Sequence, residues 1–494
     1  MMYAVTSVIK IRYSLFLTWP KITFLSILII FSSQTLSSPT SENPIIPEIR
    51  NDLLQPNPFI HIPGPNPILR VSQKPGWDDG VLETAGIFKD FGTYYLYYHA
   101  TGAGKGYQVG VATTSHPLGP FKRYEGNPIL QIGEKGSWED IHVACAIIIK
   151  EGVDKFYMWY CGHGTKHKNP DGSFGGIWDI GLATSSHPLG PWHKYENNPV
   201  IQDFGYVSAV VKANDKYYLY TAHPIDLTGP DYSPMAVATA EKPEGPWVKY
   251  SGNPILQEGE WGEWDDGGFS DAAVIYHSGI FHMFPAGAKL YSPRIKTRES
   301  LGYAYSFDGY HFIKYGRNPI ASRNTNPNAA SFSEPRVLIE MPYIYVYHTL
   351  RYKQENPPYA NLEDIGVQVL VTETGFSFDM PVLVRETLDA GAITILEDSP
   401  PVSLSNVKRL ALTAECRYTE KADEAILIHV ISSPNGIKYD TSDLFLLKNN
   451  FEPGKTVRKT FDLQTNVRFI KVLVENPDKT EAVSDIFITA TLGS

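Results

Sequence analysis

The sequence predicts an all-β fold, and three repeated patterns support this prediction. The dipeptide Asn-Pro opens five similar blocks, at Asn66, Asn127, Asn198, Asn253 and Asn318, with copies 55 to 71 residues apart. Each copy precedes an apolar run, a turn marked by Gly or Asp, and a Tyr-rich run such as GTYYLYYHATG from Gly92. A third strand pattern follows, such as VGVATTSHPLGPFKRY or IGLATSSHPLGPWHKY. One block cannot bury both faces of its sheet, so neighbouring copies must stack, and five copies predict a five-bladed β-propeller.

The blades account for most of the chain. Residues 59–390 hold the repeats and form the expected catalytic domain, and the Pro-rich residues 39–58 are expected to be a linker or a strap over the propeller. Pro400 and Pro401 mark a domain boundary. Residues 403–494 alternate apolar and polar positions without the repeat, which predicts a β-sandwich. The end of this segment resembles a discoidin-type or galactose-binding jelly roll, and a sugar-binding module and a structural lid both remain open for it.

Composition excludes several classes of partner. The 494 residues have a formal net charge of −10 and no basic cluster, which argues against nucleic acid or an anionic membrane as partner. Cys145 and Cys161 fall on opposite arms of one expected hairpin; two buried thiols are favoured over a cross-strand disulfide, and Cys416 has no partner either way. None has metal-site spacing, and no metal or cofactor is expected.

The N-terminus resembles an export signal. Lys10, Arg12 and Lys21 precede the apolar stretch Ile22–Phe31, and small polar residues follow. This pattern predicts a signal peptide over residues 1–38, cleaved near Ser37 or Ser38. The mature protein is then expected to be secreted or periplasmic, with no membrane segment after cleavage.

Candidate chemistry lies where the first strand of each blade begins and the second ends, because these ends share one rim. Before the first strand, WDDG from Trp77, WEDI from Trp138 and WDDG from Trp264 align, making Asp79, Asp140 and Asp266 equivalent. Architectural roles are favoured for the Trp residues and the first acid of each motif. Trp77 is also a candidate for stacking on a sugar ring. For the second acid, structure and catalysis are equally favoured.

The places where blades differ give further candidates. Asp271 and Glu334 occupy equivalent positions at the starts of two first strands, and Glu83 lies one residue out of that register. Carboxylates there are costly unless they are paired or face a site, and converging acids push their pKa values apart, as acid–base catalysis requires. The catalytic candidates are therefore Asp79, Glu83, Asp140, Asp271 and Glu334. The alternative is a set of salt bridges to Arg336, Arg351 or Arg294.

Histidines end four of the second strands. Together with His142 from a first strand, and with Arg336 and Arg351, they are candidates for binding sugar hydroxyls. The complete set of substrate-binding candidates is Trp77, His99, His142, His163, His223, Arg336, His348 and Arg351.

Residues 60–385 resemble five-bladed propeller glycoside hydrolases. The resemblance lies in the Asn-Pro-Ile-Leu repeats, the Tyr-Tyr-Leu second strands, SHPLGPF/W and Ser-Phe-Asp-Gly-Tyr-x-Phe. The group includes families 43, 62, 32, 68, 117 and 130. Family 43 would imply an Asp base in blade 1 (Asp79 or Glu83), an Asp in blade 2 that tunes the pKa (Asp140), and a Glu acid in blade 3. Blade 3 has no such acid, and the nearest equivalent is Glu334 in blade 5. Family 117 uses acids of later blades and a histidine, which fits Asp271 and Glu334 better.

The expectation is therefore a secreted glycoside hydrolase of an arabinofuranosidase-, xylosidase- or galactosidase-like type. It would cleave a polysaccharide or oligosaccharide by inversion, with a carboxylate acid–base pair. Glu334 or Asp271 would be the acid, and Asp79 or Glu83 the base. Two alternatives remain. A phosphate-dependent phosphorylase would need the cations Lys289, Arg294, Lys296 and Arg298, and a non-catalytic carbohydrate-binding propeller would explain the missing acid in blade 3.

Overall fold

The computed structural model describes residues 60–102, 104–167, 178–222, 234–277, 279–289, 299–322, 332–340, 342–351, 363–371, 377–404, 407–464 and 466–493. The expected signal peptide (1–38) and linker (39–58) lie outside these residues. Within the described ranges the chain is strands with two short 3₁₀ turns, so the predicted all-β class is confirmed.

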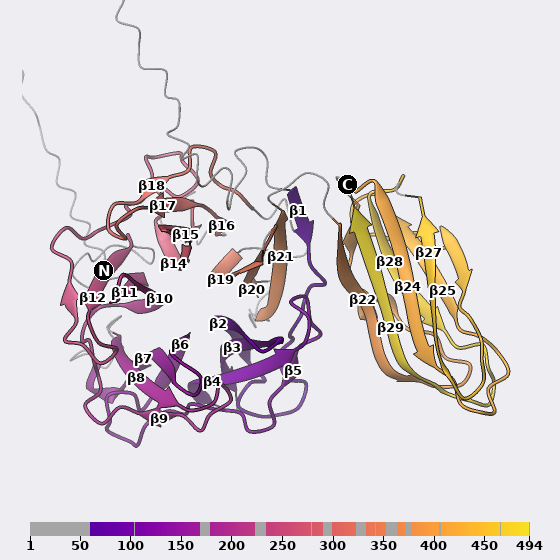
Figure 1. Cartoon of the computed structure of the whole chain (residues 1–494), viewed down its shortest axis with the longest axis horizontal. Helices are drawn as coiled ribbons and strands as arrows, with labels where there is room; N and C mark the ends of the chain where they lie inside the picture. Colours follow the sequence, from indigo (N-terminus) through magenta and orange to yellow (C-terminus); the bar gives the residue numbers. More distant parts are fainter. Residues whose placement is uncertain are drawn as a thin grey trace, which may run out of the picture. The chain divides into compact units, whose positions relative to one another are not determined.

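Five antiparallel sheets follow one another along the chain and form a ring (Figure 1). We call them ring sheets 1 to 5. Sheets 1 to 3 consist of β2 (Val81–Asp90), β3 (Thr93–Gly102), β4 (Lys105–Thr114) and β5 (Lys122–Arg123); β6 (His142–Lys150), β7 (Phe156–His163), β8 (Asp179–Ser185) and β9 (His193–Lys194); and β10 (Tyr206–Ala213), β11 (Lys216–Ala222), β12 (Ala236–Ala240) and β13 (Val248–Lys249).

Sheets 4 and 5 complete the ring. They consist of β14 (Phe269–His277), β15 (Ile280–Gly287), β16 (Ser300–Leu301), β17 (Ala304–Ser306) and β18 (Ile313–Lys314); and of β19 (Phe332–Glu340), β20 (Tyr343–Arg351), β21 (Glu363–Val371) and β1 (Ile60–Pro63). The first strands contact one another in a closed cycle, β2 to β6, β10, β14, β19 and back to β2. These strands therefore line the inside of the ring.

The repeated asparagines hold the sheets together. In every copy the Asn side chain accepts a hydrogen bond from a backbone N–H in or next to the third strand of a sheet, and donates one to the carbonyl of the same residue. The pairs are Asn127 with Val111, Asn198 with Leu182, Asn253 with Val237, Asn318 with Tyr303, and Asn66 with Val367. Each Asn thus bonds to the sheet before it rather than the one after it.

The first copy of this contact closes the ring. Asn66 and Val367 are 301 residues apart, and their hydrogen bonds measure 2.6 and 3.1 Å. Beside them β1 pairs with β21 in antiparallel register, Ile60 opposite Val371. The fourth strand of ring sheet 5 therefore comes from the start of the described chain.

The remaining strands form two four-stranded sheets, which we call the C-terminal sheets. One has the order β22 (Ser377–Leu388), β29 (Val483–Gly493), β24 (Arg409–Arg417) and β27 (Thr456–Leu463), and the other β23 (Val402–Ser403), β28 (Phe469–Glu475), β25 (Leu427–Ser433) and β26 (Phe445–Lys448). The expected boundaries placed residues 377–388 in the propeller. The structure instead pairs β22 with β29, because alternation specifies a strand but not its partner.

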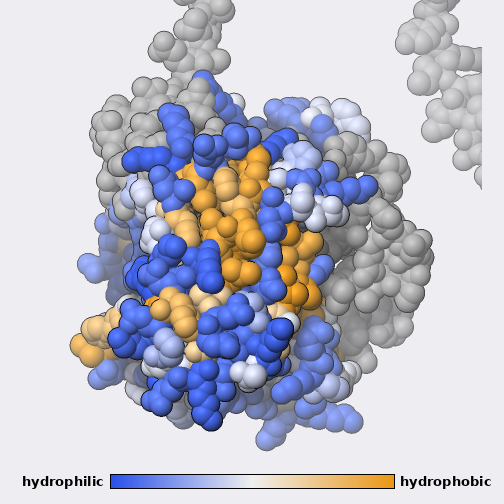
Figure 2. Space-filling view, turned by 90° about the vertical axis from the view of Figure 1, so that its right-hand side faces the viewer, coloured by the Kyte–Doolittle hydropathy of each residue, from blue (hydrophilic) through white to orange (hydrophobic). Residues whose placement is uncertain are grey.

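One hydrophobic cluster joins ring sheets 1 and 5 to the C-terminal sheets. It includes Leu82 and Val367 of the ring and Met380, Ile428 and Ile488 of the C-terminal sheets, all fully buried. On the far side, edge strands β26 and β27 carry the exposed Leu446 and the half-buried Phe445 and Phe461. Figure 2 shows that side of the molecule, where hydrophobic side chains gather within a hydrophilic border. Over the described residues no helix is long and apolar enough to cross a membrane.

Candidate functional site

A β-bulge interrupts the first strand of every ring sheet near the same end. The shifts in register fall between Thr84 and Gly86, Ala144 and Ile147, Val207 and Ala209, Phe269 and Asp271, and Ser333 and Arg336. A bulge bends its strand and redirects side chains, and such bulges are common beside active sites. The predicted residues Glu83, Asp271, Glu334 and Arg336 all lie at or next to these bulges.

Two of the bulges contain residues in the left-handed region of backbone space. Cys145 has φ 54° and Glu334 has φ 44°. These values cost free energy for any residue with a Cβ, so the surrounding contacts must hold both residues in place. Strain of this kind concentrates at functional sites, which singles out Glu334 among the predicted carboxylates.

Arg336 joins three ring sheets at the inside of the ring. Its Nη1 lies 2.9 Å from Oδ2 of Asp271, and both side chains are about 5% exposed. The same guanidinium donates to the carbonyl of Pro335 at 2.7 Å and to that of Ala85 in β2. Asp271 Oδ1 also accepts the amide of Ala272 at 2.7 Å. The salt bridge that the sequence offered as an alternative therefore forms.

Thr84 links the same region to Glu334. Its Oγ1 donates to the backbone carbonyl of Glu334 at 2.8 Å, and its amide donates to Oγ1 of Thr349 at 3.0 Å. These bonds join β2 to β19 and β20. We call Thr84, Ala85, Asp271, Glu334, Arg336 and Thr349 the axial network.

Glu83 pairs with one of the predicted histidines. Its Oε2 lies 2.8 Å from Nε2 of His99, and the side chains are 11% and 4% exposed. Glu83 and His99 face each other across β2 and β3. This places a carboxylate–imidazole pair one residue from Thr84 of the axial network.

His99 belongs to a set of rings from sheets 1 to 3. Adjacent ring centroids lie 5.0 to 6.0 Å apart in the series His99, Tyr107, His142, His163, Trp178 and Tyr206. We call this set the histidine–aromatic cluster. Its flat apolar faces and ring nitrogens are the groups that stack on sugar rings and bind hydroxyls.

His142 is neutral within this cluster. The amide of Tyr107 donates to its Nδ1 at 3.0 Å, so that nitrogen carries no proton. Burial, followed by the neighbouring His163 and His99, lowers the pKa of His142 to about 4. At neutral pH its other ring nitrogen therefore carries the proton and is a hydrogen-bond donor.

The cysteines lie between the cluster and the network. Cys145 and Cys161 are buried free thiols, as the favoured interpretation expected. A hydrogen bond with Cys161, and then burial, raise the pKa of Cys145, and the charges of Asp271 and Arg336 also act on it. Burial raises the pKa of Tyr206, with smaller contributions from both cysteines and Glu83. Cys145 is therefore within electrostatic reach of Asp271 and Arg336 of the axial network, and of Tyr206 of the histidine–aromatic cluster.

The side chains of Asp79 and Asp140 stabilise turns through hydrogen bonds to backbone amides. Asp79 accepts the amide of Gly76 at 3.1 Å, and the equivalent Asp266 accepts that of Gly262 at 2.8 Å. Asp140 accepts the amides of Gly136 and Thr165, each at 2.7 Å. Burial alone would raise the pKa of Asp140, but these hydrogen bonds hold it below its usual value. All four hydrogen bonds match the architectural interpretation of the motif.

The other acids and the Trp residues of the motif are also held by architectural contacts. The first acids form ion pairs with short outer strands, namely Asp78 with Arg123, Glu139 with Lys194 and Asp265 with Lys314. Trp77 stacks on Tyr98 with ring centroids 5.6 Å apart.

The other predicted residues make structural contacts or lie outside the described residues. His348 is fully buried, donates through Nδ1 to its neighbour's carbonyl at 3.2 Å and contacts the ring of Phe332. His223, Arg294, Lys296 and Arg298 lie outside the described residues, as does the side chain of Arg351. Lys289 donates to the carbonyl of Gly262 at 2.7 Å. Nowhere in the described ranges do three His, Cys, Asp or Glu side chains gather as a metal site would require.

Sequence reasoning missed Tyr107, Trp178, Tyr206, Thr84 and Thr349. The first two lie beside the start of a third strand, which shares its rim with the end of the second strand. The rim geometry that selects the ends of first and second strands also selects Tyr107 and Trp178 when it is applied to the starts of third strands.

The known proteins to which parts of this chain are similar include carbohydrate-active enzymes. No family model matches the chain. A 1,2-beta-oligomannan phosphorylase from Thermoanaerobacter sp. (strain X514) is 28% identical over 93 residues, which is 18% of this chain and only 31% of that protein.

Three solved structures of glycoside hydrolases are similar at 13 to 14% identity. A glycosyl hydrolase from Bacteroides ovatus matches 62% of this chain and 93% of its own (TM-score 0.47). A family 117 glycoside hydrolase from Zobellia galactanivorans matches 64% and 91% (TM-score 0.44). The family 32 β-fructofuranosidase of Bombyx mori matches 87% and 95% (TM-score 0.44). These similarities assign no family to the chain.

Proposed function

We propose that the protein is a glycoside hydrolase, built as a five-bladed β-propeller with a C-terminal jelly-roll sandwich. The closed cycle of five first strands supports the blade number. Numbered from β22, the C-terminal strands have the orders 1-8-3-6 and 2-7-4-5, which supports a two-sheet jelly roll. The substrate class is a polysaccharide or oligosaccharide.

One observation carries the catalytic proposal. Glu83, Asp271 and Glu334 come from three separate sheets and lie near the starts of the inner strands. The Asp271 carboxylate pairs with Arg336, Thr84 donates to the backbone carbonyl of Glu334, and Glu83 precedes Thr84 in the chain. In this proposal Glu334 protonates the leaving oxygen as the glycosidic bond breaks, and Glu83 takes a proton from the attacking water. The salt bridge between Asp271 and Arg336 fixes the strand ends beside Glu334. The histidine–aromatic cluster holds the sugar.

Replacing the proposed acid tests this assignment. We expect Glu334→Gln to lower kcat at least about 10²-fold, since a general acid contributes about 10²–10⁴-fold, and to leave Tm nearly unchanged. Turnover would be measured on nitrophenyl glycosides and a polysaccharide panel. The matched control is Glu340→Gln at the other end of β19, where Glu340 binds Lys89 and Tyr94. Full activity in Glu334→Gln, or an equal loss in the control, would refute the role of Glu334.

The local match to a phosphorylase favours phosphorolysis as the second candidate. The same assays with and without inorganic phosphate distinguish the two reactions, because a phosphorylase releases a sugar 1-phosphate and a hydrolase a free reducing sugar. Binding of oligosaccharide without release of either product would indicate the non-catalytic alternative.

Export is part of the proposal and rests on the sequence of residues 1–38 alone. The expected mature N-terminus lies just after Ser37 or Ser38. N-terminal sequencing of the protein recovered outside the cytoplasm tests it, and an intact Met1 in that fraction would contradict cleavage.

A further inference from the structure

Two adjoining cavities lie where ring sheet 5 meets the C-terminal sheets. Each has a volume of about 380 Å³, and they share Asn66, Pro67, Arg70 and Glu397 in their walls. We call them together the junction cleft. Each volume falls within the range of about 300–1,000 Å³ that is typical of small-molecule sites. The cleft is separate from the axial network, because no residue of that network lines it.

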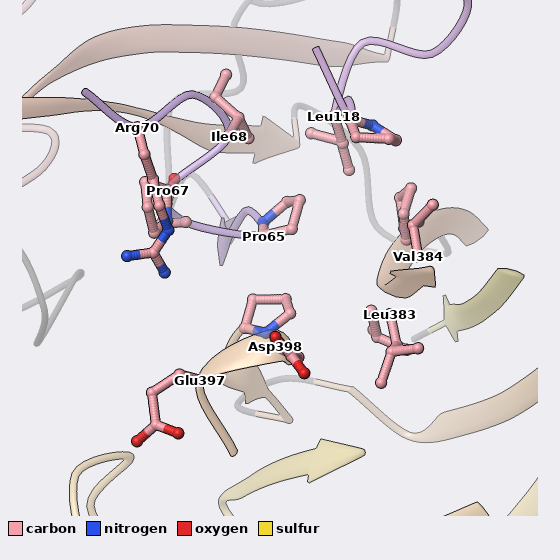
Figure 3. A pocket seen from close by; sticks show the side chains of 14 residues that line it. Pro65, Pro67, Ile68, Arg70, Leu118, Leu383, Val384, Glu397 and Asp398 are labelled. Atoms are coloured by element: carbon pink, nitrogen blue, oxygen red, sulfur yellow. The ribbon is translucent and has the colours of Figure 1, made fainter. Parts of the chain in front are cut away.

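The two ends of the first cavity differ in polarity. Figure 3 shows Leu118, Leu383 and Val384 on one side of the cavity and the charged ends of Arg70 and Glu397 on the other. Proline rings lie between them, contributed by both the ring and the C-terminal sheets. A ligand in this cavity would therefore contact apolar C–H surfaces and charged hydrogen-bonding groups at once.

The polar end continues into the second cavity. Lys471 of β28 lines that cavity, and its Nζ donates to the carbonyl of Leu396 at 2.7 Å. Burial lowers the pKa of Lys471, Glu397 opposes this effect, and Arg70 adds to it. The three charged groups therefore lie within electrostatic reach of one another across the shared wall.

The charges of the junction cleft are balanced. Arg70 and Lys471 are matched by Glu397 and Asp364. Asp398 is paired with Arg385 at 3.1 Å. Because the positive and negative charges are equal in number, the cleft has no net charge that would favour an ionic ligand. Its walls carry both hydrogen-bond donors and acceptors. A neutral, polyhydroxylated molecule matches this surface, because its hydroxyls both donate and accept and its ring C–H faces can lie on proline.

We propose that the junction cleft is a second carbohydrate-binding site, which holds a neutral sugar chain remote from the reacting bond. Two cavities in series suit a chain rather than a single ring. That the ligand is a carbohydrate rests on the proposed function. The junction cleft would contribute to the binding of long substrates only.

The test compares long and short probes. We expect the double variant Arg70→Ala/Glu397→Ala to lose about 10-fold in affinity for arabinan, xylan or β-1,2-mannan, whichever the wild type binds. Its kcat/KM on the matching disaccharide should equal that of the wild type. Val384→Trp, which fills the apolar end, should act in the same way. Affinity would be measured by calorimetric titration and electrophoresis in gels that contain the polymer.

The matched control removes the same charges elsewhere. Glu452 and Lys455 form an exposed pair at 2.7 Å in the C-terminal sheets, so Glu452→Ala/Lys455→Ala should bind the polymers as the wild type does. Unchanged affinity in both cleft variants, or no polymer binding by the wild type, would overturn the proposal. Failure of the proposed function is distinct, because the wild type would then release no sugar from the disaccharides either.

Discussion

At the scale of single residues, the main finding is that similar acids have different surroundings. Asp140 is held by turn amides, Asp271 by a guanidinium and Glu83 by an imidazole. Aligned motifs therefore do not imply equal chemistry. The carboxylates at bulges remain the candidates for catalysis, whereas Asp79 and Asp140 hold their turns in shape.

Burial of His348 predicts a pH-dependent stability. Burial lowers its pKa to about 4, against an ordinary value of 6.5. Between these values the unfolded chain binds more protons than the folded one, so the stability is fully present above pH 6.5 and falls as the pH drops toward 4. The full difference is on the order of 3 kcal/mol.

Denaturant unfolding at pH 7.5 and pH 5 measures this effect. His348→Gln should remove most of the contribution of this residue to the loss at pH 5, while the exposed His193→Gln should keep the wild-type dependence. Equal pH dependence in wild type and His348→Gln would show that His348 is not the responsible group.

At the scale of elements, the Asn-Pro repeat acts as a clamp on the third strand of each sheet. Asn198 makes two hydrogen bonds with the backbone of Leu182 and one with Tyr160, while its neighbour Asn197 is exposed and contacts only Tyr195 among the described bonds. We expect Asn198→Ala to lower the free energy of unfolding by about 1–3 kcal/mol, because it leaves buried backbone groups without partners. Asn197→Ala is the matched control and should change it by less than about 0.5 kcal/mol. Chemical denaturation of the two variants decides, and equal values would contradict a clamp.

Elements also show what the sequence alone could predict. Periodicity predicted the all-β class and the repeated blocks of strands, and in ring sheets 1 to 3 each strand pairs with its neighbour in the chain. It did not assign β22 to β29 or β1 to β21, since these partners are more than a hundred residues apart. The same limit applies to the site. Asp271 and Arg336 were both predicted, but only the fold determines that they meet, whereas the cluster residue Tyr107 was not considered at all.

At the scale of the whole molecule, the shared hydrophobic cluster predicts joint unfolding. Fully buried residues of ring sheets 1 and 5 and of the C-terminal sheets belong to one cluster, so separating the two parts exposes apolar surface on both. We expect one calorimetric transition, and a chain cut before residue 377 should aggregate as its exposed apolar surface associates. Two separate transitions, or a stable monomeric fragment, would show that the two parts are independent.

The pairing of β1 with β21 determines when the ring can close during synthesis. The ribosome releases Asn66 long before Val367, which lies 301 residues later. During that interval the nascent chain carries an early strand whose partner does not yet exist. The ring can therefore close only after β21 has been translated. A stop codon upstream of β21 yields a chain in which β1 has no strand to pair with.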